Sequence, residues 1–205
     1  TYGHGTHSPR DEAAYLLAYA LDVPPGRLAG RSAQPVTSSQ RRRFDSLLRQ
    51  RIRERIPAPY LTREAWLGDF SFYVDRRVIV PRSFIAELLR DGLEIWLKAP
   101  VRRVLDLCTG SGCLAVLAAH AFPRARVDAA DLSLAALAVA RRNVLHYHLS
   151  RRVRLVRSDL FDALGGHRYD LILSNPPYVT AASMRALPRE YRHEPRLALA
   201  GGADG

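Results

Sequence analysis

Apolar positions in the first sixty residues recur at helical spacing. One such stretch runs from Asp11 to the prolines at 24 and 25, and a second begins after the capping residues 37–39 and ends at Pro57. The apolar side of the second stretch is formed by Phe44, Leu47, Leu48, Ile52 and Ile56. A polar cap, an apolar stripe and a terminal proline are typical of amphipathic helices, so we expect two helices here.

Between residues 60 and 80 the apolar positions alternate instead. Phe70, Phe72 and Val74 alternate with other residues, residues 75–77 suit a turn, and 78–80 is a second apolar run. This pattern predicts a β-hairpin that turns at 75–77. Residues 81–83 then cap a further helix, whose apolar positions are Ile85, Leu88, Leu89, Leu93 and Trp96.

From Val101 onward, short apolar runs alternate with helical stretches. The predicted strands are 103–108, 126–131, 153–157 and 169–174, and the helices between the first three begin near Gly112 and Ser133. This alternation implies parallel strands joined by crossover helices, and therefore the α/β class with a Rossmann-like sheet. We divide the chain into a helical domain (1–56), a hairpin linker (57–82) and a sheet domain (83–205).

Composition places the chain among ordinary globular proteins. Its 205 residues are 47% apolar and 25% charged, enough for one core with a small appended domain. No apolar run is long enough to span a bilayer and no signal-peptide pattern opens the chain, so we expect a cytoplasmic protein without a membrane partner. Cys108 and Cys113 form no Cys-x-x-Cys pair, so neither a disulfide framework nor a metal site is predicted.

The formal net charge is +11, and Lys98 is the single lysine among 31 basic residues. Excess arginine with abundant alanine and leucine also results from the codon bias of a GC-rich genome, which weakens the charge as evidence for nucleic acid. A polyanionic neighbourhood such as a ribosome is still favoured. The second helix carries Arg41, Arg42, Arg43, Arg49, Arg51, Arg53 and Arg55. These form either a solvated face or a phosphate-binding stripe.

The stretch from Val104 to Gly112 is typical of a buried strand that enters a glycine turn and a helix. Gly110 and Gly112 allow the backbone to approach a ligand closely, and the helix N-terminus suits a carboxylate or phosphate. Asp131 ends the next predicted strand, where a carboxylate can accept hydrogen bonds from two ribose hydroxyls. Alone, this pattern also fits a dinucleotide-binding fold.

Two further carboxylates change that picture. Asp106 lies inside the first strand, where a dinucleotide-binding enzyme normally has an apolar residue, and Asp159 follows the third strand. A glycine turn, a ribose acid and an adenine acid at three successive strand ends describe an S-adenosylmethionine pocket. Asp159 could instead cap a helix.

The fourth predicted strand runs directly into Asn175-Pro176-Pro177-Tyr178. Prolines supply no N–H donors, so carbonyls of this loop are left free as acceptors. Asn175 adds a side-chain carbonyl and Tyr178 a flat apolar ring. Together they would hold a planar group that carries an NH2, such as an amide or the exocyclic amine of a base. The alternative is an ordinary proline turn.

With these motifs the chain resembles the class I S-adenosylmethionine-dependent methyltransferases that have an Asn-Pro-Pro-Tyr loop. More closely, it is similar to the bacterial protein-(glutamine-N5) methyltransferases. The resemblance covers nearly the whole chain, including Val80-Pro81-Arg82 and Glu194-Pro195. The release-factor branch usually has Pro-Arg-Pro-Glu/Asp-Thr at the hairpin exit, whereas this chain has Pro-Arg-Ser-Phe-Ile at 81–85. Together with residues 2–6 and 54–62, this resembles the branch that methylates the third protein of the large ribosomal subunit.

The charge and the arginines of helix 41–55 make contact with the ribosome or rRNA a further expectation. The resemblance implies S-adenosylmethionine as the cofactor and a large-subunit ribosomal protein as the partner. It implies these cofactor-binding residues: Asp106, Cys108, Thr109, Gly110, Ser111, Gly112, Asp131, Leu132, Asp159, Leu160 and Asn175. It assigns the glutamine amide to Asn175, Pro176, Pro177 and Tyr178, of which Asn175, Pro176 and Tyr178 would be catalytic. This scheme requires that residues 108–112 and 175–178 leave the same edge of the sheet.

Other functions compete with this interpretation. The same loop serves methylation of exocyclic amines on RNA or DNA, and a release-factor glutamine methyltransferase, a binding module without catalysis and a dinucleotide oxidoreductase are further alternatives. The chain also ends at Gly205, whereas the family it resembles continues with further strands. We therefore expect a truncated sheet domain whose fourth strand forms an edge.

Overall fold

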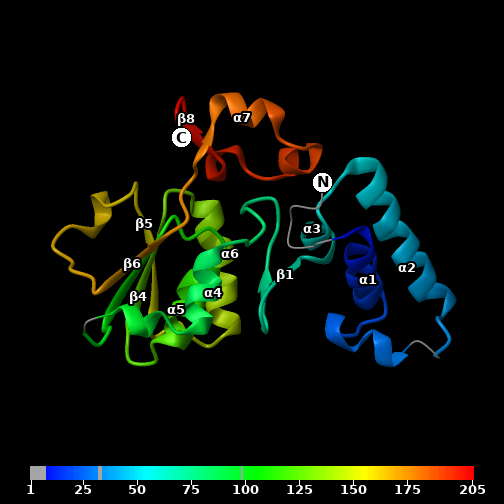
Figure 1. Ribbon diagram of the computed structural model, residues 1–205, viewed down its shortest axis with the longest axis horizontal. Coiled ribbons are helices and arrows are strands. Elements are labelled where there is room, and N and C mark those ends of the chain that lie inside the picture. Colours follow the sequence, from blue (N-terminus) through cyan, green and yellow to red (C-terminus); the bar gives the residue numbers. More distant parts are fainter. Residues whose placement is uncertain (1–7, 32–33, 98) are drawn as a thin grey trace.

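The computed structural model describes residues 8–31, 34–97 and 99–205. Helices lie at one end, a parallel sheet with its own helices lies at the other, and a hairpin lies between them (Figure 1). The predicted α/β class and Rossmann-like sheet are confirmed. None of the helices in the described ranges is long and apolar enough to cross a bilayer.

The helical part contains α1 (Pro9–Ala20), α2 (Ser38–Arg49) and α3 (Ala58–Thr62). Both long helices begin at side-chain caps: the Ser8 hydroxyl accepts the N–H of Asp11, and Thr37 forms a reciprocal capping box with Gln40. After α2 the chain continues as one π-helical stretch over Gln50–Glu54. The core of this part consists of Leu16, Ala20, Leu47 and Ala58.

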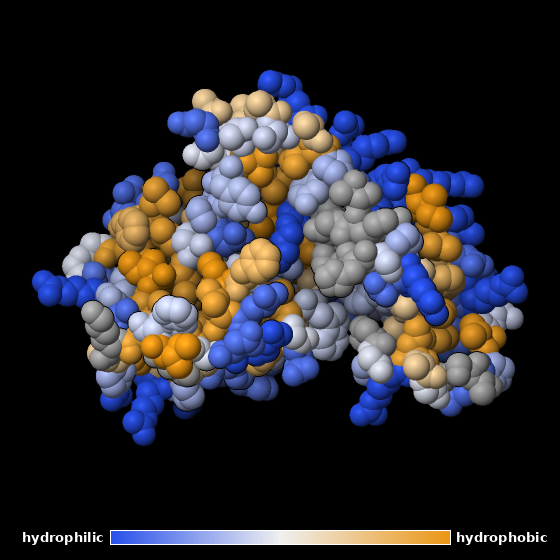
Figure 2. Space-filling model, viewed as in Figure 1, coloured by the Kyte–Doolittle hydropathy of each residue, from blue (hydrophilic) through white to orange (hydrophobic). Residues whose placement is uncertain are grey.

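The arginines of the second helix do not form one uniform face. Arg41, Arg42, Arg49, Arg53 and Arg55 are exposed, and Figure 2 shows hydrophilic side chains projecting along the right-hand edge, over α2. Arg51 is only 6% exposed, however, because it is ion-paired with two buried carboxylates. The interpretation of all seven arginines as a single solvated face or stripe is therefore wrong for Arg51.

The hairpin forms, but its predicted turn is wrong. Strands β1 (Glu64–Leu67) and β2 (Phe70–Tyr73) pair antiparallel, so the chain turns at Gly68-Asp69, where Gly68 has φ +58°. Positive φ is easy for glycine, which allows this tight turn. The apolar run 78–80 is loop, and its valines are buried against α6 (Leu134–His146) rather than paired as a strand.

Four parallel strands form the sheet in the order β5-β4-β3-β6: β3 (Arg103–Leu107), β4 (Arg126–Asp131), β5 (Val153–Arg157) and β6 (Leu171–Ser174). All four were predicted to within two residues at each end. The helices α5 (Cys113–Ala121) and α6 pack on one face of the sheet together with α4 (Phe84–Asp91) (Figure 1). Apolar residues of these helices and of the strands form the largest core. Strand β6 is an edge strand, as expected, with Ile172 49% exposed.

Helix α4 is shorter than predicted. It spans Phe84–Asp91 and begins at the Ser83 cap, but it ends at Gly92, whose φ of +99° stops it. Leu93–Trp96 then forms a 3-10 turn, and Trp96 is 74% exposed. The apolar positions beyond Gly92 therefore do not continue the helix.

The last thirty residues cross the carboxyl edge of the sheet. They contain β7 (Val179–Thr180), α7 (Ala181–Ala186) and β8 (Ala200–Gly202), with 3-10 turns at Arg189–His193 and Arg196–Ala198. Strands β7 and β8 pair in parallel. In Figure 1 this segment, coloured orange to red, lies above the sheet and reaches toward the helical part.

Candidate active site

The two central loops of the site leave neighbouring strands. Leu107 at the end of β3 is paired with Ser174 at the end of β6, and the Ser174 hydroxyl donates to the Leu107 carbonyl at 3.1 Å. Because these strands are parallel, both following loops emerge at the same edge. Residues 108–112 and 175–178 are therefore side by side, as the sequence interpretation required.

The glycine turn is built from residues with left-handed backbone. Cys108, Gly110 and Gly112 have φ of +59°, +56° and +77°, and the Thr109 N–H donates to the Ala130 carbonyl at 2.9 Å. A Cβ on Gly112 would lie 3.0 Å from the Ala140 Cβ, so glycine is needed for helix packing. A Cβ on Gly110 would meet nothing within 4 Å, which means that open space adjoins the turn there.

Asp131 holds the glycine turn in place. Its Oδ2 accepts the Gly110 N–H at 2.8 Å, and its Oδ1 accepts the Ser133 N–H at 2.9 Å. Each carboxylate oxygen keeps acceptor capacity beyond these bonds. The neighbouring Leu132 is 43% exposed. The site thus offers a fixed acceptor beside apolar surface, which suits a ribose and its base.

Asp106 lies beneath the turn and is fully buried. Its Oδ2 accepts the Thr109 hydroxyl, and its Oδ1 has no hydrogen-bond partner among the described residues. Burial, assisted by the charge of Asp131, raises the pKa of Asp106 to about 7, although the Thr109 hydroxyl and the Ala115 N–H act in the opposite direction. This carboxyl supports the turn from below and is partly protonated near neutral pH.

A tight turn follows the third strand. The Ser158 hydroxyl donates to the Leu160 carbonyl at 2.8 Å and accepts the Ala163 N–H at 3.0 Å. Leu160 consequently has φ +45° and is 54% exposed. Asp159 is exposed, and its carbonyl accepts the Asp162 N–H at 3.0 Å. The Ser158 N–H donates to the Asp131 carbonyl at 3.1 Å, which joins this turn to the end of β4.

The charges of this edge fit a cationic nucleoside. Burial first, and then the carboxylates of Asp131, Asp106 and Asp159, raise the pKa of the Cys108 thiol. A local cluster of carboxylates is unusual on a chain with net charge +11. S-adenosylmethionine carries a sulfonium and an ammonium charge besides its ribose and adenine. The acidic groups, the apolar surface and the open space beside Gly110 fit that molecule.

The loop after β6 lines two adjoining hollows. Asn175 is half-buried and Tyr178 is 68% exposed. With Arg82 they line a groove of about 1050 Å³ between the hairpin turn and the start of α4, and a smaller pocket of about 180 Å³ that also includes Tyr191. Space for a protein side chain therefore exists directly at Asn175.

Sequence reasoning missed the segment that supports this loop. The Val179 N–H donates to the Leu199 carbonyl at 2.9 Å, and β8 packs against the loop. A Cβ on Gly201 would lie 2.9 Å from the Pro177 carbonyl oxygen, so only glycine allows this approach. The consecutive glycines at 201 and 202 were the available signal.

It also missed the role of Glu194. The Glu194 carboxylate is buried and accepts from the Arg82 guanidinium at 2.8 and 2.5 Å and from the Val80 N–H at 3.2 Å. The Arg82 guanidinium lies 4.9 Å from the centre of the Tyr191 ring. Glu194-Pro195 stood out in the sequence only as part of a family resemblance.

Asn143 is a third residue that sequence reasoning missed. It is 1% exposed; its Nδ2 donates to the carbonyls of Ser111 at 2.8 Å and Tyr73 at 3.0 Å, and its Oδ1 accepts the Tyr73 N–H at 2.8 Å. It therefore ties the hairpin to the glycine turn. An amide at a core position of a largely apolar helix was the signal that could have revealed it.

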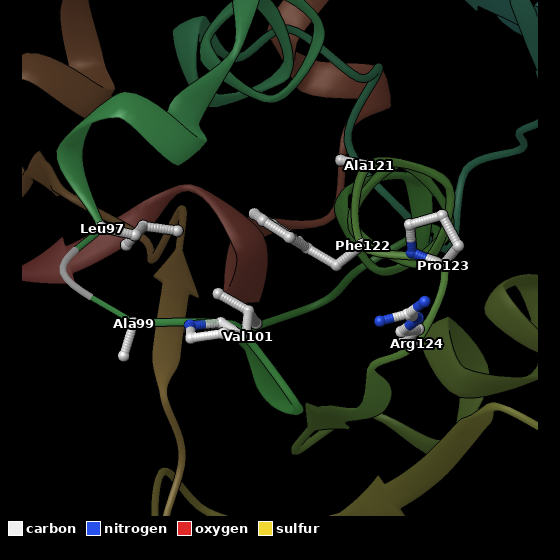
Figure 3. A pocket seen from close by; sticks show the side chains of 8 residues that line it. Leu97, Ala99, Val101, Ala121, Phe122, Pro123 and Arg124 are labelled. Carbon is white, nitrogen blue, oxygen red and sulfur yellow. The ribbon is translucent and has the colours of Figure 1, made fainter.

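A further hollow of about 520 Å³ lies at the other end of the sheet, before β3. Figure 3 shows Leu97, Val101 and Phe122 converging on it, with Arg124 at its rim. Among the described residues that line it, Arg124 is the one charged group. The described lining of this hollow offers no set of converging polar groups like that at the carboxyl edge, so we do not assign the chemistry to this hollow.

Comparison with known proteins gives two family models and several close relatives. Residues 87–189 match the methyltransferase small domain, and residues 3–62 match the PrmC N-terminal domain. A ribosomal protein uL3 glutamine methyltransferase of Bordetella pertussis is 57% identical over 99% of this chain and 69% of its own length. A protein of the same name from Neisseria meningitidis serogroup A is 52% identical over 100% of this chain and 68% of its own length. Another from Burkholderia pseudomallei is 51% identical over 100% of this chain and 69% of its own length.

Proposed function

Since this chain belongs to the family of the ribosomal protein uL3 glutamine methyltransferases, we propose that it methylates the side-chain amide of a glutamine in ribosomal protein uL3. S-adenosylmethionine is the cofactor and supplies the methyl group from a sulfonium, which leaves as a neutral thioether with the bonding electron pair. The observation that carries the proposal is the pairing of Leu107 with Ser174, because it aligns the glycine turn with the Asn-Pro-Pro-Tyr loop.

The chemical difficulty is the amide nitrogen, whose lone pair is delocalised into the carbonyl. In our proposal the Asn175 side-chain oxygen and the Pro176 carbonyl accept the two N–H bonds of the glutamine amide. Tyr178 stacks on the amide plane. Both contacts orient the nitrogen lone pair toward the glycine-turn side, and they stabilise the positive charge that develops on nitrogen.

No strong base is required in this scheme. The amide N–H becomes acidic once the nitrogen carries the additional carbon, so a proton is lost to water afterwards. What the protein contributes is alignment and preorganised acceptors in a partly dehydrated pocket. The half-buried position of Asn175 supports this role, because water competes less for its oxygen there.

We further propose that the helical domain (1–56) recognises the protein substrate and that the hairpin linker (57–82) joins it to the methyltransferase domain (83–205). The exposed arginines of α2 and of the π-helical stretch would contact rRNA phosphates if an assembling ribosome, rather than free uL3, is the substrate. Arg51 is not part of that contact because it is buried. Since ribosomes assemble in the bacterial cytoplasm, we place the reaction there.

Methyl transfer to purified uL3 from tritium-labelled S-adenosylmethionine tests the proposal. Asn175→Ala should lower kcat on the order of a hundredfold, by analogy with the loss of one preorganised polar group, and should lower the affinity for S-adenosylmethionine far less than it lowers kcat. Ser150→Ala, an exposed position at the opposite end of the sheet, is the control and should retain wild-type turnover. Normal turnover by the Asn175 variant would remove that residue from the mechanism.

The choice of substrate is tested separately. Wild-type protein is incubated with purified uL3, with naked rRNA and with DNA, and the labelled product is digested to identify the modified group. We expect label only in a glutamine of uL3. Label in a nucleobase would refute the protein substrate and favour the exocyclic-amine alternative.

A further inference from the structure

Arg51 joins the helical domain to the segment that follows the Asn-Pro-Pro-Tyr loop. Its Nε donates to Glu12 at 2.8 Å, and one terminal nitrogen donates to Glu190 at 3.2 Å. The three side chains are between 5% and 8% exposed. Such a buried ion-paired group restricts the relative positions of the segments that it joins, because separating the partners would leave a buried charge without compensation.

Two further contacts connect the same two segments. The Arg55 guanidinium lies 3.5 Å from Glu190, and the His193 Nε2 lies 2.9 Å from the Glu54 carbonyl oxygen. Burial alone would raise the pKa of Glu190, but a backbone hydrogen bond and the two arginines hold it below its ordinary value. Glu190 therefore remains ionised and attractive to Arg51 at neutral pH.

The other end of this short segment forms part of the substrate pocket. Glu194 binds the Arg82 guanidinium, and Tyr191 lines the small pocket together with Asn175 and Pro176. Residues 189–194 are thus held at Glu190 by the helical domain and at Glu194 by the exit of the hairpin. In Figure 1 this stretch follows α7 and extends toward the helices at the right.

We infer that Arg51 and Glu190 are positioning residues, which set the distance and orientation between the helical domain and the amide pocket around Asn175. The inference rests on the proposed function, in which the helical domain binds the protein substrate. A substrate held by that domain presents its glutamine to Asn175 in productive register only while the Arg51–Glu190 link is intact. Without the link, substrate still binds, but the reactive alignment is populated less often.

Steady-state kinetics with uL3 test this inference. Glu190→Ala is the main variant, because Arg51 then keeps Glu12 as a partner and no unpaired charge is buried. We expect kcat to fall on the order of tenfold, the loss equivalent to one charge-assisted hydrogen bond, with nearly unchanged KM for uL3 and affinity for S-adenosylmethionine. Glu190→Gln, which can still accept from Arg51, should recover part of the lost kcat. Asp45→Ala is the matched control: its partner, Arg41, lies on the same helix.

A double-mutant cycle shows whether the two residues act through each other. Arg51→Met combined with Glu190→Ala should lower kcat no further than the worse single variant. Additive losses, or a uniform decline in kcat, S-adenosylmethionine binding and melting temperature, would reduce the pair to an ordinary stabilising contact and overturn the inference.

Hydrogen exchange over residues 187–194, measured without substrate, separates this inference from the substrate assignment. Exchange should quicken in Arg51→Met and Glu190→Ala but not in Asp45→Ala. If exchange is unchanged in the first two variants, the coupling is refuted even where uL3 is methylated. If uL3 is not methylated but exchange responds as expected, only the proposed substrate fails.

Discussion

Replacing Asp106 by asparagine is the sharpest test of the electrostatics beneath the glycine turn. Asp106 is fully buried, and burial together with Asp131 raises its pKa from an ordinary value near 4 to about 7. At pH values between these two pKa values, Asp106 binds a proton more often in the folded protein than in the unfolded chain. Folding stability therefore falls as the pH rises through this window, and the contribution is lost fully above pH 7.

The magnitude follows from the displacement of the pKa. Each pH unit corresponds to about 1.4 kcal/mol, so complete ionisation of Asp106 costs at most about 4 kcal/mol. At pH 5 roughly a third of that cost is already present, which leaves about 2 to 3 kcal/mol between pH 5 and pH 9. Asparagine has no such cost. It can still accept the Thr109 hydroxyl, but its NH2 would occupy the position of Oδ1, which has no hydrogen-bond partner among the described residues. That penalty, about 1 to 3 kcal/mol, does not depend on pH.

Urea unfolding of both proteins at pH 5 and pH 9 measures the difference. Relative to wild type, Asp106→Asn should gain about 2 to 3 kcal/mol in the free energy of unfolding between the two pH values. Asp170→Asn is the control. The N–H groups of Arg102 and Arg103 lower the pKa of Asp170, so its contribution is lost only as the pH falls below about 4 and stays constant over this range. If the free energy of unfolding of Asp106→Asn differs from that of wild type by the same amount at pH 5 and at pH 9, the reasoning is refuted.

Three further predictions concern the cofactor site. Gly112→Ala should destabilise the fold by about 2 kcal/mol or more, seen as a lower melting temperature, because the position has φ +77° and the new Cβ meets Ala140; an unchanged melting temperature would contradict the packing. Asn143→Ala removes three buried hydrogen bonds that tie the hairpin to the glycine turn. It should weaken S-adenosylmethionine binding, measured by calorimetry, on the order of tenfold or more. Equal affinity would show that the glycine turn does not depend on Asn143. Asp131→Asn should weaken the same binding about tenfold to a hundredfold, since it replaces a charged acceptor by a neutral one, and wild-type affinity would exclude Asp131 from the ribose site.

Local patterns were sufficient for the sheet and for the place of the chemistry. The central strands β3 and β4 are buried over most of their length and appear as largely apolar runs. The outer strands β5 and β6 are partly exposed, but their valines, leucines and isoleucine still form short stretches bounded by polar residues. The carboxyl ends of parallel strands share one edge, so the residues that follow them could be brought together without coordinates. The α/β fold and the adjacency of residues 108–112 and 175–178 were therefore predictable from the chain alone.

Other features depend on residues that are far apart in the chain. The hairpin turn was misplaced because buried valines at 78 and 80 resemble a strand, whereas they pack against α6 as loop. Nothing near Arg51 in the sequence distinguishes it from its exposed neighbours, since its partner Glu190 lies 139 residues away. The partners of Arg82 and Asn143 also lie far away in the chain, so the sequence does not show which groups they bind, although an amide inside a largely apolar helix marks Asn143 as unusual.

Periodicity and turn chemistry are local properties, so the sequence by itself determined most elements of this protein, the edge where the glycine turn and the Asn-Pro-Pro-Tyr loop meet, and the acceptors that these loops carry. Burial of a charge or an amide is decided only when distant segments fold against each other, because a desolvated polar group must find its partner in space rather than along the chain. The tertiary structure alone therefore decided that Arg51 is the buried arginine of its stretch, that Glu190 and Glu194 pair with distant arginines, and that the N-terminal helices are joined to residues 189–194.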